Sequence, residues 1–350
     1  MRVLHVDSGR EYRGGQDQAR LLARELARAP ALEQRLLTRR DSELAHRAAA
    51  DGVAVRGVSW GPGLDPRAWG RLVAESRAWR PDLIHAHNNH AVTLAVWARR
   101  VLHYTGFAPR IVATRRVVFP LRAGSALRHA DAVIAISRAV QTGLVAAGIA
   151  PGRISVVPDG VDPEGVRAAA ATPLAIRARL ALADATPLAA NIAALEPSKD
   201  QVTLVRAAQA ARTLCPGLHW VIAGTGPDRS VLEREIRRLD VADRVHLLGY
   251  VEQADALIRE SDVLVMSSKQ EGLGSVVLHA LALGRPVVAA AGGGLPEIVP
   301  AEWLVPVGDA DGLARKVVRA LEHPSPIPLP PQFTAAAMAA AVLALYRSLV

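Results

Sequence analysis

The stretch SSKQEGLGSVVLHALALGRPVVAAAGGGLPEIV, residues 267–299, decides the fold. It follows the apolar run Val263–Met266, places Gly272 and Gly274 before an apolar helical segment, and then enters a second apolar run. Strand, glycine loop, helix and strand in this order are typical of a parallel βαβ unit. Free amides and the helix dipole favour an anion at such a loop. Glu271 would repel phosphate there, so it suits hydroxyl groups of a sugar better.

The same alternation of short apolar runs and longer amphipathic stretches continues along the chain in two series. The first series of expected strands is Arg2–Val6, Glu33–Leu37, Ala54–Gly57, Leu83–Ala86, Arg110–Thr114, Ala132–Ile136 and Ile154–Val157. The second is Leu188–Ile192, His219–Ala223, Val245–Leu247, Val263–Met266, Pro286–Ala289 and Leu304–Val305. We therefore expect an α/β protein with two doubly wound parallel sheets, and a ligand outside the carboxyl ends of the strands.

Proline-rich stretches indicate the domain limits. Asp159–Pro187, with an Ala-rich helix in its middle, is interpreted as the linker, and Pro324–Pro331 precedes a last helix. The expected domains are residues 1–170 and 171–332. A length of 350 residues suits two such domains. The second glycine cluster, Gly292–Gly294, would admit a sugar close to the backbone of the second domain.

The charge is unevenly distributed. The chain has 42 Lys and Arg against 33 Asp and Glu, a formal net charge of +9, and residues 1–172 hold 25 basic against 15 acidic residues. This indicates nucleic acid, an anionic membrane or an acidic substrate as partner of the first half, or only a bias toward Arg. Aromatic residues make up 4% and no nucleic-acid motif is present. Nucleic acid is therefore disfavoured, and we expect no nucleic-acid partner.

The cellular location is expected to be the cytoplasm. No uncharged apolar run of about 18 to 20 residues is present, so no membrane span is expected. The first residues, MRVLHVDSG, enter a strand pattern without the zones of a secretory signal. The single Cys215 has no partner for an internal disulfide.

Two loops of the first half suggest anion binding. Gly14 and Gly15, in SGREYRGGQDQ, allow a negative oxygen close to the start of a helix, or form only a tight turn. Arg115 and Arg116, in ATRRVVFP, cannot both point the same way in an extended segment. One of them is expected to clamp a phosphate or carboxylate, and surface charge is the alternative.

Two further loops carry polar groups after expected strands. In IHAHNNHA, residues 84–91, His87 and Asn88 suit contacts with a polar substrate or local hydrogen bonds. A metal is disfavoured, because a zinc site needs three or four converging ligands, commonly including a carboxylate or thiolate, and no such partner lies nearby in the sequence. In NIAALEPSKD, residues 191–200, Lys199 is one of only three lysines in an Arg-rich chain, which indicates a point charge at this loop.

Taken together, these motifs resemble the retaining GT-B glycosyltransferases of family 4. The resemblance covers nearly the whole chain and includes ADAVIAISRAV, VVPDGVD, VIAGTGPDR, VHLLGYV, GGLPEIV and ALYRSL. It implies two Rossmann-like domains facing a central cleft, with the last helix, residues 333–350, returning to the first domain. The acceptor is expected on the first domain and a nucleotide-sugar donor on the second. It also implies that no metal or cofactor is needed, because cations and helix dipoles stabilise the leaving diphosphate.

The resemblance implies that Lys199 neutralises the donor phosphates and that Glu271 contacts the transferred sugar. Together with the loops above, the expected catalytic residues are Lys199, Glu271 and Arg116. The expected donor-binding residues are Gly224, Gly226, Tyr250, Val251, Gly272, Gly274, Ser275 and His279. The expected acceptor or phosphate loop contains Gly14, Gly15, His87, Asn88 and Arg115.

Three positions depart from the family pattern. The second glutamate of the E-x7-E motif falls on His279, which accepts only one hydrogen bond when neutral. The arginine five residues before the phosphate lysine falls on Ala194, and the histidine after the T-x-H strand of the first domain falls on Arg116. Either Arg115 or Arg116 replaces the lost charge, or the donor differs, or the acceptor is anionic.

The expected function is retaining transfer of a sugar from a nucleotide-diphosphate sugar to an acceptor hydroxyl. A lipid-linked or lipopolysaccharide-type glycan of a bacterial cell envelope is the preferred acceptor, with peripheral contact of the basic first domain to an anionic membrane. The alternatives are a nucleotide-sugar-binding protein with lost or altered transfer activity, and another GT-B enzyme such as an epimerase. The pattern around EGLG speaks against the epimerase.

Overall fold

The computed structural model describes residues 1–61 and 65–350, which form two compact units. Unit 1 consists of residues 1–160 and 331–350, and unit 2 of residues 161–330. All thirteen expected strands are found in the described ranges, with ends displaced by at most two residues. The expectation of two parallel α/β units is therefore confirmed.

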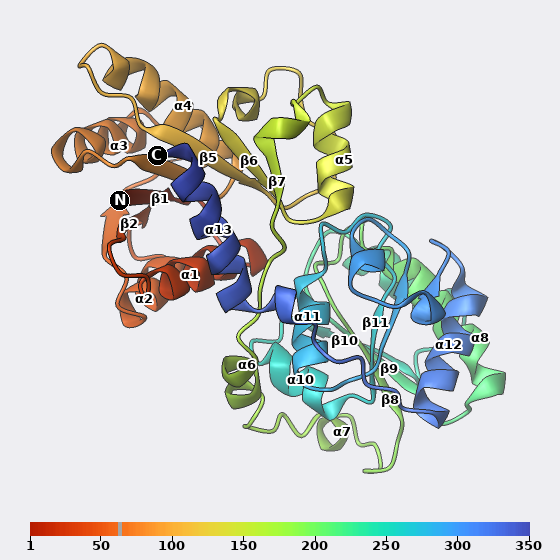
Figure 1. The fold of residues 1–350 in the computed structure, drawn as a ribbon. Coiled ribbons are helices and arrows are strands. Elements are labelled where there is room, and N and C mark those ends of the chain that lie inside the picture. The colour runs from red at the N-terminus through yellow and green to blue at the C-terminus, as the bar shows by residue number, and fades with distance from the viewer. Residues whose placement is uncertain (62–64) are drawn as a thin grey trace. The chain divides into compact units, whose positions relative to one another are not determined.

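Unit 1 contains a seven-stranded parallel sheet with the order β3-β2-β1-β4-β5-β6-β7 (Figure 1). Its strands are β1 Arg2–Val6, β2 Glu33–Arg39, β3 Val55–Val58, β4 Leu83–Ala86, β5 Arg110–Arg115, β6 Ala132–Ala135 and β7 Ile154–Val156. Its helices are α1 Gly14–Leu26, α2 Glu43–Ala50, α3 Pro66–Trp79, α4 Asn89–His103, α5 Arg138–Ala146 and α13 Ala335–Leu349. Short 3-10 turns occupy Ala126–His129, Pro151–Arg153 and Pro331–Phe333.

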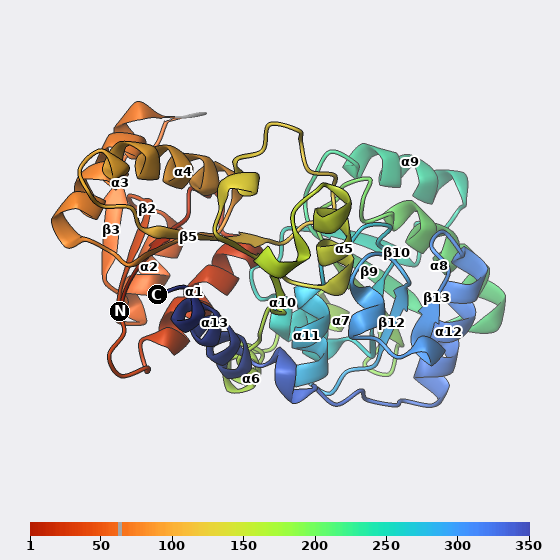
Figure 2. The ribbon, with the colours of Figure 1, turned by 45° about the horizontal axis from the view of Figure 1, so that its top comes forward.

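The last helix, α13, completes the core of unit 1. It lies beside α1 in both views (Figures 1 and 2), and buried side chains of the two helices share one apolar cluster with strands of the sheet. Tyr346 is fully buried, and its hydroxyl lies 2.5 Å from Nδ1 of His85 on β4. The return of the last helix to the amino-terminal unit is therefore as expected, and one buried polar contact fixes its position.

Unit 2 contains a six-stranded parallel sheet with the order β10-β9-β8-β11-β12-β13. Its strands are β8 Leu188–Ile192, β9 His219–Ala223, β10 Val245–Gly249, β11 Val263–Met266, β12 Val287–Ala290 and β13 Leu304–Val305. Its helices are α6 Pro163–Ala169, α7 Ile176–Arg179, α8 Gln201–Leu214, α9 Arg229–Arg238, α10 Ala254–Glu260, α11 Ser275–Ala282 and α12 Ala310–Glu322. Two 3-10 turns occupy Leu295–Glu297 and Ala301–Trp303.

The expected domain limits need correction. The interpreted linker, Asp159–Pro187, lies mostly inside unit 2, because α6 packs against α10 and α11 and Ile176 of α7 is buried in the apolar core of that unit. The first limit therefore falls after Gly160 and not after residue 170, and the return falls at Pro331. Proline-rich composition indicated an irregular path but not where the chain packs.

The units differ in charge more than the halves of the sequence do. Unit 1 holds 25 basic and 13 acidic residues, and unit 2 holds 17 and 20. The basic excess thus belongs to the unit that carries the Gly14 loop and the Arg115–Arg116 segment. In the two described ranges, no helix has both the length and the apolar character needed to cross a membrane.

Replacing Tyr346 with Phe should lower the free energy of unfolding of unit 1 by about 1–3 kcal/mol, because the buried Nδ1 of His85 loses its partner. Urea unfolding followed by circular dichroism measures this change. Tyr104→Phe, at a side chain that is 89% exposed, is the matched control and should have no effect. Equal stability of Tyr346→Phe and the unchanged protein would show that the contact does not hold α13.

Candidate functional site

The loops that follow β8, β9, β11 and β12 meet at the carboxyl edge of the unit 2 sheet. Backbone hydrogen bonds join them: the amide of Leu195 donates to the carbonyl of Thr225 at 3.0 Å, and the amide of Lys269 donates to that of Ser198 at 2.9 Å. The amide of Gly294 donates to the carbonyl of Glu271 at 2.9 Å. The loop residues expected to bind a donor are thus brought together by main-chain contacts.

Glycine makes this close packing possible. Gly224, Gly226 and Gly293 have positive φ, and a Cβ atom at each would collide with the carbonyl of Ala193, Leu195 or Glu271, respectively. Gly292–Gly294 therefore pack against the backbone of residues 268–272, which lead into the EGLG stretch. The structure gives this cluster a packing role, which is a sufficient reason for glycine, and contact with a sugar stays a prediction.

Lys199 and Glu271 form an ion pair in this loop cluster. Lys199 Nζ lies 2.6 Å from Glu271 Oε2, and the hydroxyl of Ser268 donates to the same carboxylate oxygen at 3.2 Å. The side chains of Lys199 and Glu271 are 21% and 13% exposed, so both remain accessible. The pair stands before α11, whose N-cap Gly274 has a φ of +94° and leads into Ser275. The cation, the free amides and the carboxylate can together bind an anion and hydroxyl groups.

A second lysine lies in the same cluster and was not identified from the sequence. Lys269 Nζ is 3.1 Å from Asp200 Oδ1, and the lysine side chain is 51% exposed. Two of the three lysines of the chain therefore stand in these loops. The rarity of lysine, which singled out Lys199, was a signal for Lys269 as well.

His279 has a carboxylate partner from another helix. Its Nδ1 lies 2.7 Å from Oδ1 of Asp255, which is in the first turn of α10. His279 stands where the family pattern has a glutamate, and Asp255 places a carboxylate next to this position. The sequence did not indicate Asp255, because α10 and α11 become neighbours only when both pack onto the folded sheet.

The remaining donor-side residues differ in exposure. Tyr250 is 74% exposed, whereas Val251 packs against the apolar core that contains Leu257. The carbonyl of Ala194 accepts a hydrogen bond from Gln201 Nε2 at 2.9 Å. Of Tyr250 and Val251, only Tyr250 presents a large free surface to a ligand.

In unit 1, the guanidinium groups of Arg115 and Arg116 have different partners, as expected for an extended segment. Arg116 Nε lies 3.2 Å from Asp159 Oδ1, and its Nη1 donates to the carbonyl of His87 at 3.2 Å. A Cβ at Gly15 would lie 3.7 Å from Arg116 Cδ, so the Gly14–Gly15 loop and Arg116 are adjacent. Burial raises the pKa of Asp159, and the nearby Arg116 opposes this shift.

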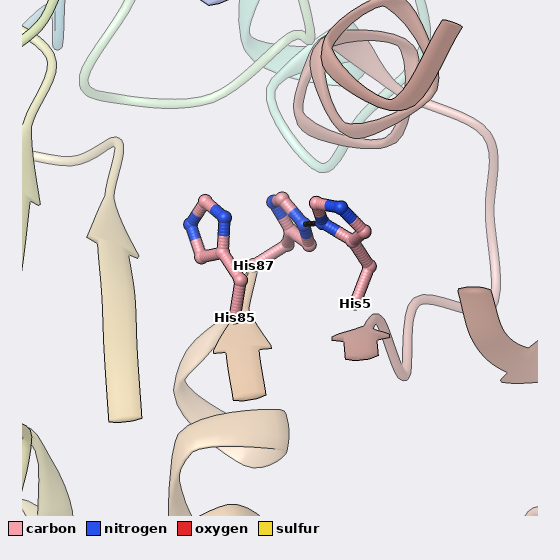
Figure 3. A group of neighbouring side chains, drawn as sticks. All are labelled: His5, His85 and His87. Atoms are coloured by element: carbon pink, nitrogen blue, oxygen red, sulfur yellow. Dashed lines mark hydrogen bonds between the residues drawn. The ribbon is translucent and has the colours of Figure 1, made fainter. Parts of the chain in front are cut away.

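Asn88 and His87 make local contacts. Asn88 caps α4: its Oδ1 accepts from the amide of Ala91 at 3.0 Å and from the hydroxyl of Ser8 at 2.7 Å. The ring of His87 is buried, and its Nε2 lies 3.0 Å from Nδ1 of His5 on β1 (Figure 3). These bonds correspond to the local alternative that the sequence left open, and contact with a substrate stays a prediction.

His5, His85 and His87 form a buried cluster that the spacing within one loop did not reveal, because His5 comes from the neighbouring strand in register with His85. One nitrogen of each ring lies within 4.8 Å of the others. The fit to a metal ion is poor, however. His85 uses both nitrogens, for Tyr346 and for the hydroxyl of Thr114 at 2.7 Å, and the cluster contains no carboxylate.

Electrostatics keep the three rings neutral. Burial lowers the pKa of His5 to about 4 and moves the pKa values of His85 and His87 well below their usual range. The positive charge of Arg116 lowers the pKa values of His85 and His87 further. The cluster is therefore best described as neutral imidazoles that connect β1, β4 and β5 with α13.

Two family models match the chain. The model described as Glycosyltransferase Family 4 matches residues 12–164, and the model described as Glycosyl transferases group 1 matches residues 186–323. The two matches fall one in each half and together span most of the sequence. The fold and the loop cluster thus define a GT-B protein, and the chain belongs to the group 1 glycosyltransferases of family 4.

Curated relatives match parts of their own length. A GDP-mannose-dependent monoacylated alpha-(1-6)-phosphatidylinositol monomannoside mannosyltransferase of Corynebacterium glutamicum is 35% identical over 182 residues, 48% of this chain and 47% of that enzyme. The 2-deoxystreptamine glucosyltransferase of Streptomyces kanamyceticus is 28% identical over 276 residues, 75% of this chain and 68% of that enzyme. The first match thus spans about half of the relative.

Among solved structures, Anabaena HepE in complex with UDP and glucose has a TM-score of 0.76 at 21% identity and covers 99% of this chain and 94% of its own. The lipopolysaccharide outer core galactosyltransferase WaaB, in its apo form, has a TM-score of 0.73 at 17% identity and covers 100% of both chains. At these identities the likeness establishes the fold.

The stability of unit 1 should fall as the pH drops from about 6.5 toward 4. The unfolded chain binds protons at its histidines near pH 6.5, whereas the folded cluster stays neutral, so acid favours unfolding in this window. His5→Gln should reduce the slope of unfolding free energy against pH by up to about 1.4 kcal/mol per pH unit. Urea unfolding at several pH values measures it.

The pKa values of Asp7 and Asp159 are raised by burial, so these two carboxyl groups make the folded state more stable as the pH falls. The test therefore compares the slope of each variant with that of the unchanged protein. His103→Gln, at an exposed histidine of α4, is the control and should leave the slope unchanged. An unchanged slope in His5→Gln would contradict the neutral state of the buried ring.

Proposed function

We propose that the protein transfers a sugar from a nucleotide-diphosphate sugar to an acceptor hydroxyl with retention of the anomeric configuration. The observation that carries the proposal is the Lys199–Glu271 pair at the glycine-rich start of α11. Family membership supports it, as do the relatives: the name of the C. glutamicum enzyme specifies GDP-mannose, and HepE was crystallised with UDP and glucose. Because these two proteins differ in nucleotide and in sugar, the proposal specifies neither the base nor the sugar of the donor.

In the proposed reaction, the acceptor oxygen forms a bond to the anomeric carbon while the bond from that carbon to the diphosphate oxygen breaks. Lys199 and the amides near Gly274 stabilise the negative charge that grows on the diphosphate. Glu271 orients the sugar through its hydroxyls as the ring gains oxocarbenium character. The proton of the acceptor passes to a phosphate oxygen on the same face, so the step needs neither a metal nor a protein base.

Before the donor binds, Lys199 and Glu271 neutralise each other across 2.6 Å. A diphosphate competes with the carboxylate for the ammonium group, and Glu271 is then released to accept hydroxyl groups. The ion pair therefore keeps both side chains in place in the absence of donor. Lys269, held by Asp200, supplies a second positive charge in the same loop cluster.

The acceptor is proposed to bind to unit 1, on a lipid-linked or lipopolysaccharide-type glycan. Support comes from the basic excess of this unit and from the name of the C. glutamicum relative, which specifies a monoacylated phosphatidylinositol mannoside. Arg116, next to Gly15, is proposed to bind a phosphate. A cytoplasmic protein at the inner face of the cell membrane agrees with this proposal.

Loss of transfer activity with retained donor binding is the second candidate, and Ala194 and His279 motivate it. Asp255 weakens this alternative, because it places a carboxylate beside His279 and so returns the charge that the missing glutamate would have supplied. Lys199 and Glu271 are both present and accessible. These two observations favour the active enzyme.

Lys199→Ala should lower turnover by at least about a hundredfold, because it removes a charge that stabilises the leaving diphosphate. Release of nucleoside diphosphate from a panel of UDP-, GDP- and ADP-sugars measures turnover. Lys316→Ala, at a half-buried lysine whose Nζ donates to the carbonyl of Glu302, is the matched control. Near-normal turnover in Lys199→Ala would remove the proposed role, and donor binding without any turnover in the unchanged protein would support the second candidate.

His279→Glu alone should weaken nucleotide binding by about fivefold, since it places two carboxylates side by side at Asp255. Combining it with Asp255→Asn should restore or tighten binding, because the site then carries a single carboxylate as in the family pattern. Isothermal titration with UDP, GDP and ADP measures the dissociation constants. A double variant that folds but binds no nucleotide would show that the imidazole itself is required.

A further inference from the structure

The segment Val117–Leu121, which follows β5, is held in place by a buried guanidinium group. Arg115 is 6% exposed, and its Nε donates to the carbonyl of Val117 at 3.1 Å. Its Nη2 donates to the carbonyl of Phe119 at 2.7 Å, and its Nη1 donates to Asn89 Oδ1 at 3.2 Å. Two charge-assisted bonds thus anchor the main chain of this loop from inside, and a third ties Arg115 to Asn89 at the start of α4.

The loop presents apolar side chains to its surroundings. Its sequence is VVFPL, and Val117 and Phe119 are 37% and 46% exposed. Burial lowers the pKa of Arg115, which shows that placing its charge inside is unfavourable in itself. A buried cation that fixes an exposed apolar loop is difficult to explain by stability, and exposed apolar patches commonly mark binding sites.

The surroundings of the loop are basic. Residues 115–130 contain four arginines and one histidine but no acidic residue. Arg122, at the end of the apolar segment, is exposed. Arg116, at its start, lies beside Gly15 and Asp159. A ligand that matches this surface carries a negative group and a hydrocarbon part.

The position of the loop agrees with a ligand site. It leaves the carboxyl end of β5, and β4 and β6 run parallel to β5 on either side. Ligands of such sheets bind outside the carboxyl ends. The Gly14–Gly15 loop, His87 and Arg116 occupy the same edge of unit 1.

We propose that Val117–Leu121 binds the hydrocarbon chain of an anionic lipid acceptor, whose phosphate lies near Arg116 and Arg122. This inference rests on the proposed function and specifies its acceptor class as a phosphate-bearing amphiphile. Arg115 is a positioning residue in this subsite, because it contacts the loop and not the ligand. Phe119 provides the largest apolar contact.

The test measures binding of decyl phosphate, used below its micelle concentration, and of ethyl phosphate as the headgroup alone. The unchanged protein should bind decyl phosphate more tightly than ethyl phosphate. Phe119→Ser should weaken decyl phosphate binding by about tenfold, since it removes a large apolar contact, and should leave ethyl phosphate and UDP unaffected. Arg115→Gln keeps the apolar side chains but removes the anchor, so it should weaken decyl phosphate in the same way.

Tyr104→Ser is the matched control, because Tyr104 is an aromatic residue of the same unit, 89% exposed, and lies before the amino end of β5. Equal weakening by Tyr104→Ser, or no preference of the unchanged protein for decyl phosphate, would overturn the proposal. Vesicles of one part phosphatidylglycerol to three parts phosphatidylcholine form the other arm. If Phe119→Ser impairs vesicle binding but not decyl phosphate binding, the loop contacts a membrane surface and the acceptor subsite is refuted.

Failure of this proposal is distinguishable from failure of the proposed function. Decyl phosphate binding requires no donor and no turnover, and it is assayed on the folded full chain, with circular dichroism confirming the fold of each variant. Donor binding and nucleotide release depend on Lys199 in unit 2. If the protein transfers sugar but does not bind decyl phosphate, the proposed function stands and only the lipid subsite is refuted.

Discussion

Close contact between the backbones of two loops is the constraint on which the donor side depends. Gly292–Gly294 lie against residues 268–272 so tightly that any larger residue would collide with the carbonyl groups of that loop. This packing holds Glu271 in position, where it meets Lys199 from the loop after β8. The geometry of the Lys199–Glu271 ion pair therefore depends on glycines, because only residues without a side chain allow this loop packing.

In unit 1, the corresponding constraint is a set of buried polar groups that bond to one another. Tyr346, His85 and Thr114 form one connected group, and Arg116 is held by Asp159 and by the carbonyl of His87. Since unsatisfied polar groups are costly in a core, these contacts select one arrangement of α13 and of the loops after β4 and β5. The positions of the basic side chains at this edge are thus set by buried hydrogen bonds and ion pairs.

Much of the fold and part of the site were predictable from the sequence. The strands of parallel sheets are local apolar runs, so all thirteen were found, and the EGLG stretch and the lysine loop led to the family. The domain limit was misplaced by ten residues because the packing of α6 and α7 on unit 2 depends on partners far along the chain. The same reason explains why Asp255 and His5 were missed.

The sequence by itself determined the α/β class, the two series of strands, the family and the candidate residues Lys199 and Glu271, because these follow from local periodicity and short motifs. Only the tertiary structure decided which groups meet. It paired His279 with Asp255, joined His5 to His87, and turned Arg115 inward while Arg116 faced Asp159. Such pairs come from different strands and helices, and their distances are set by the packing of whole elements and not by spacing along the chain.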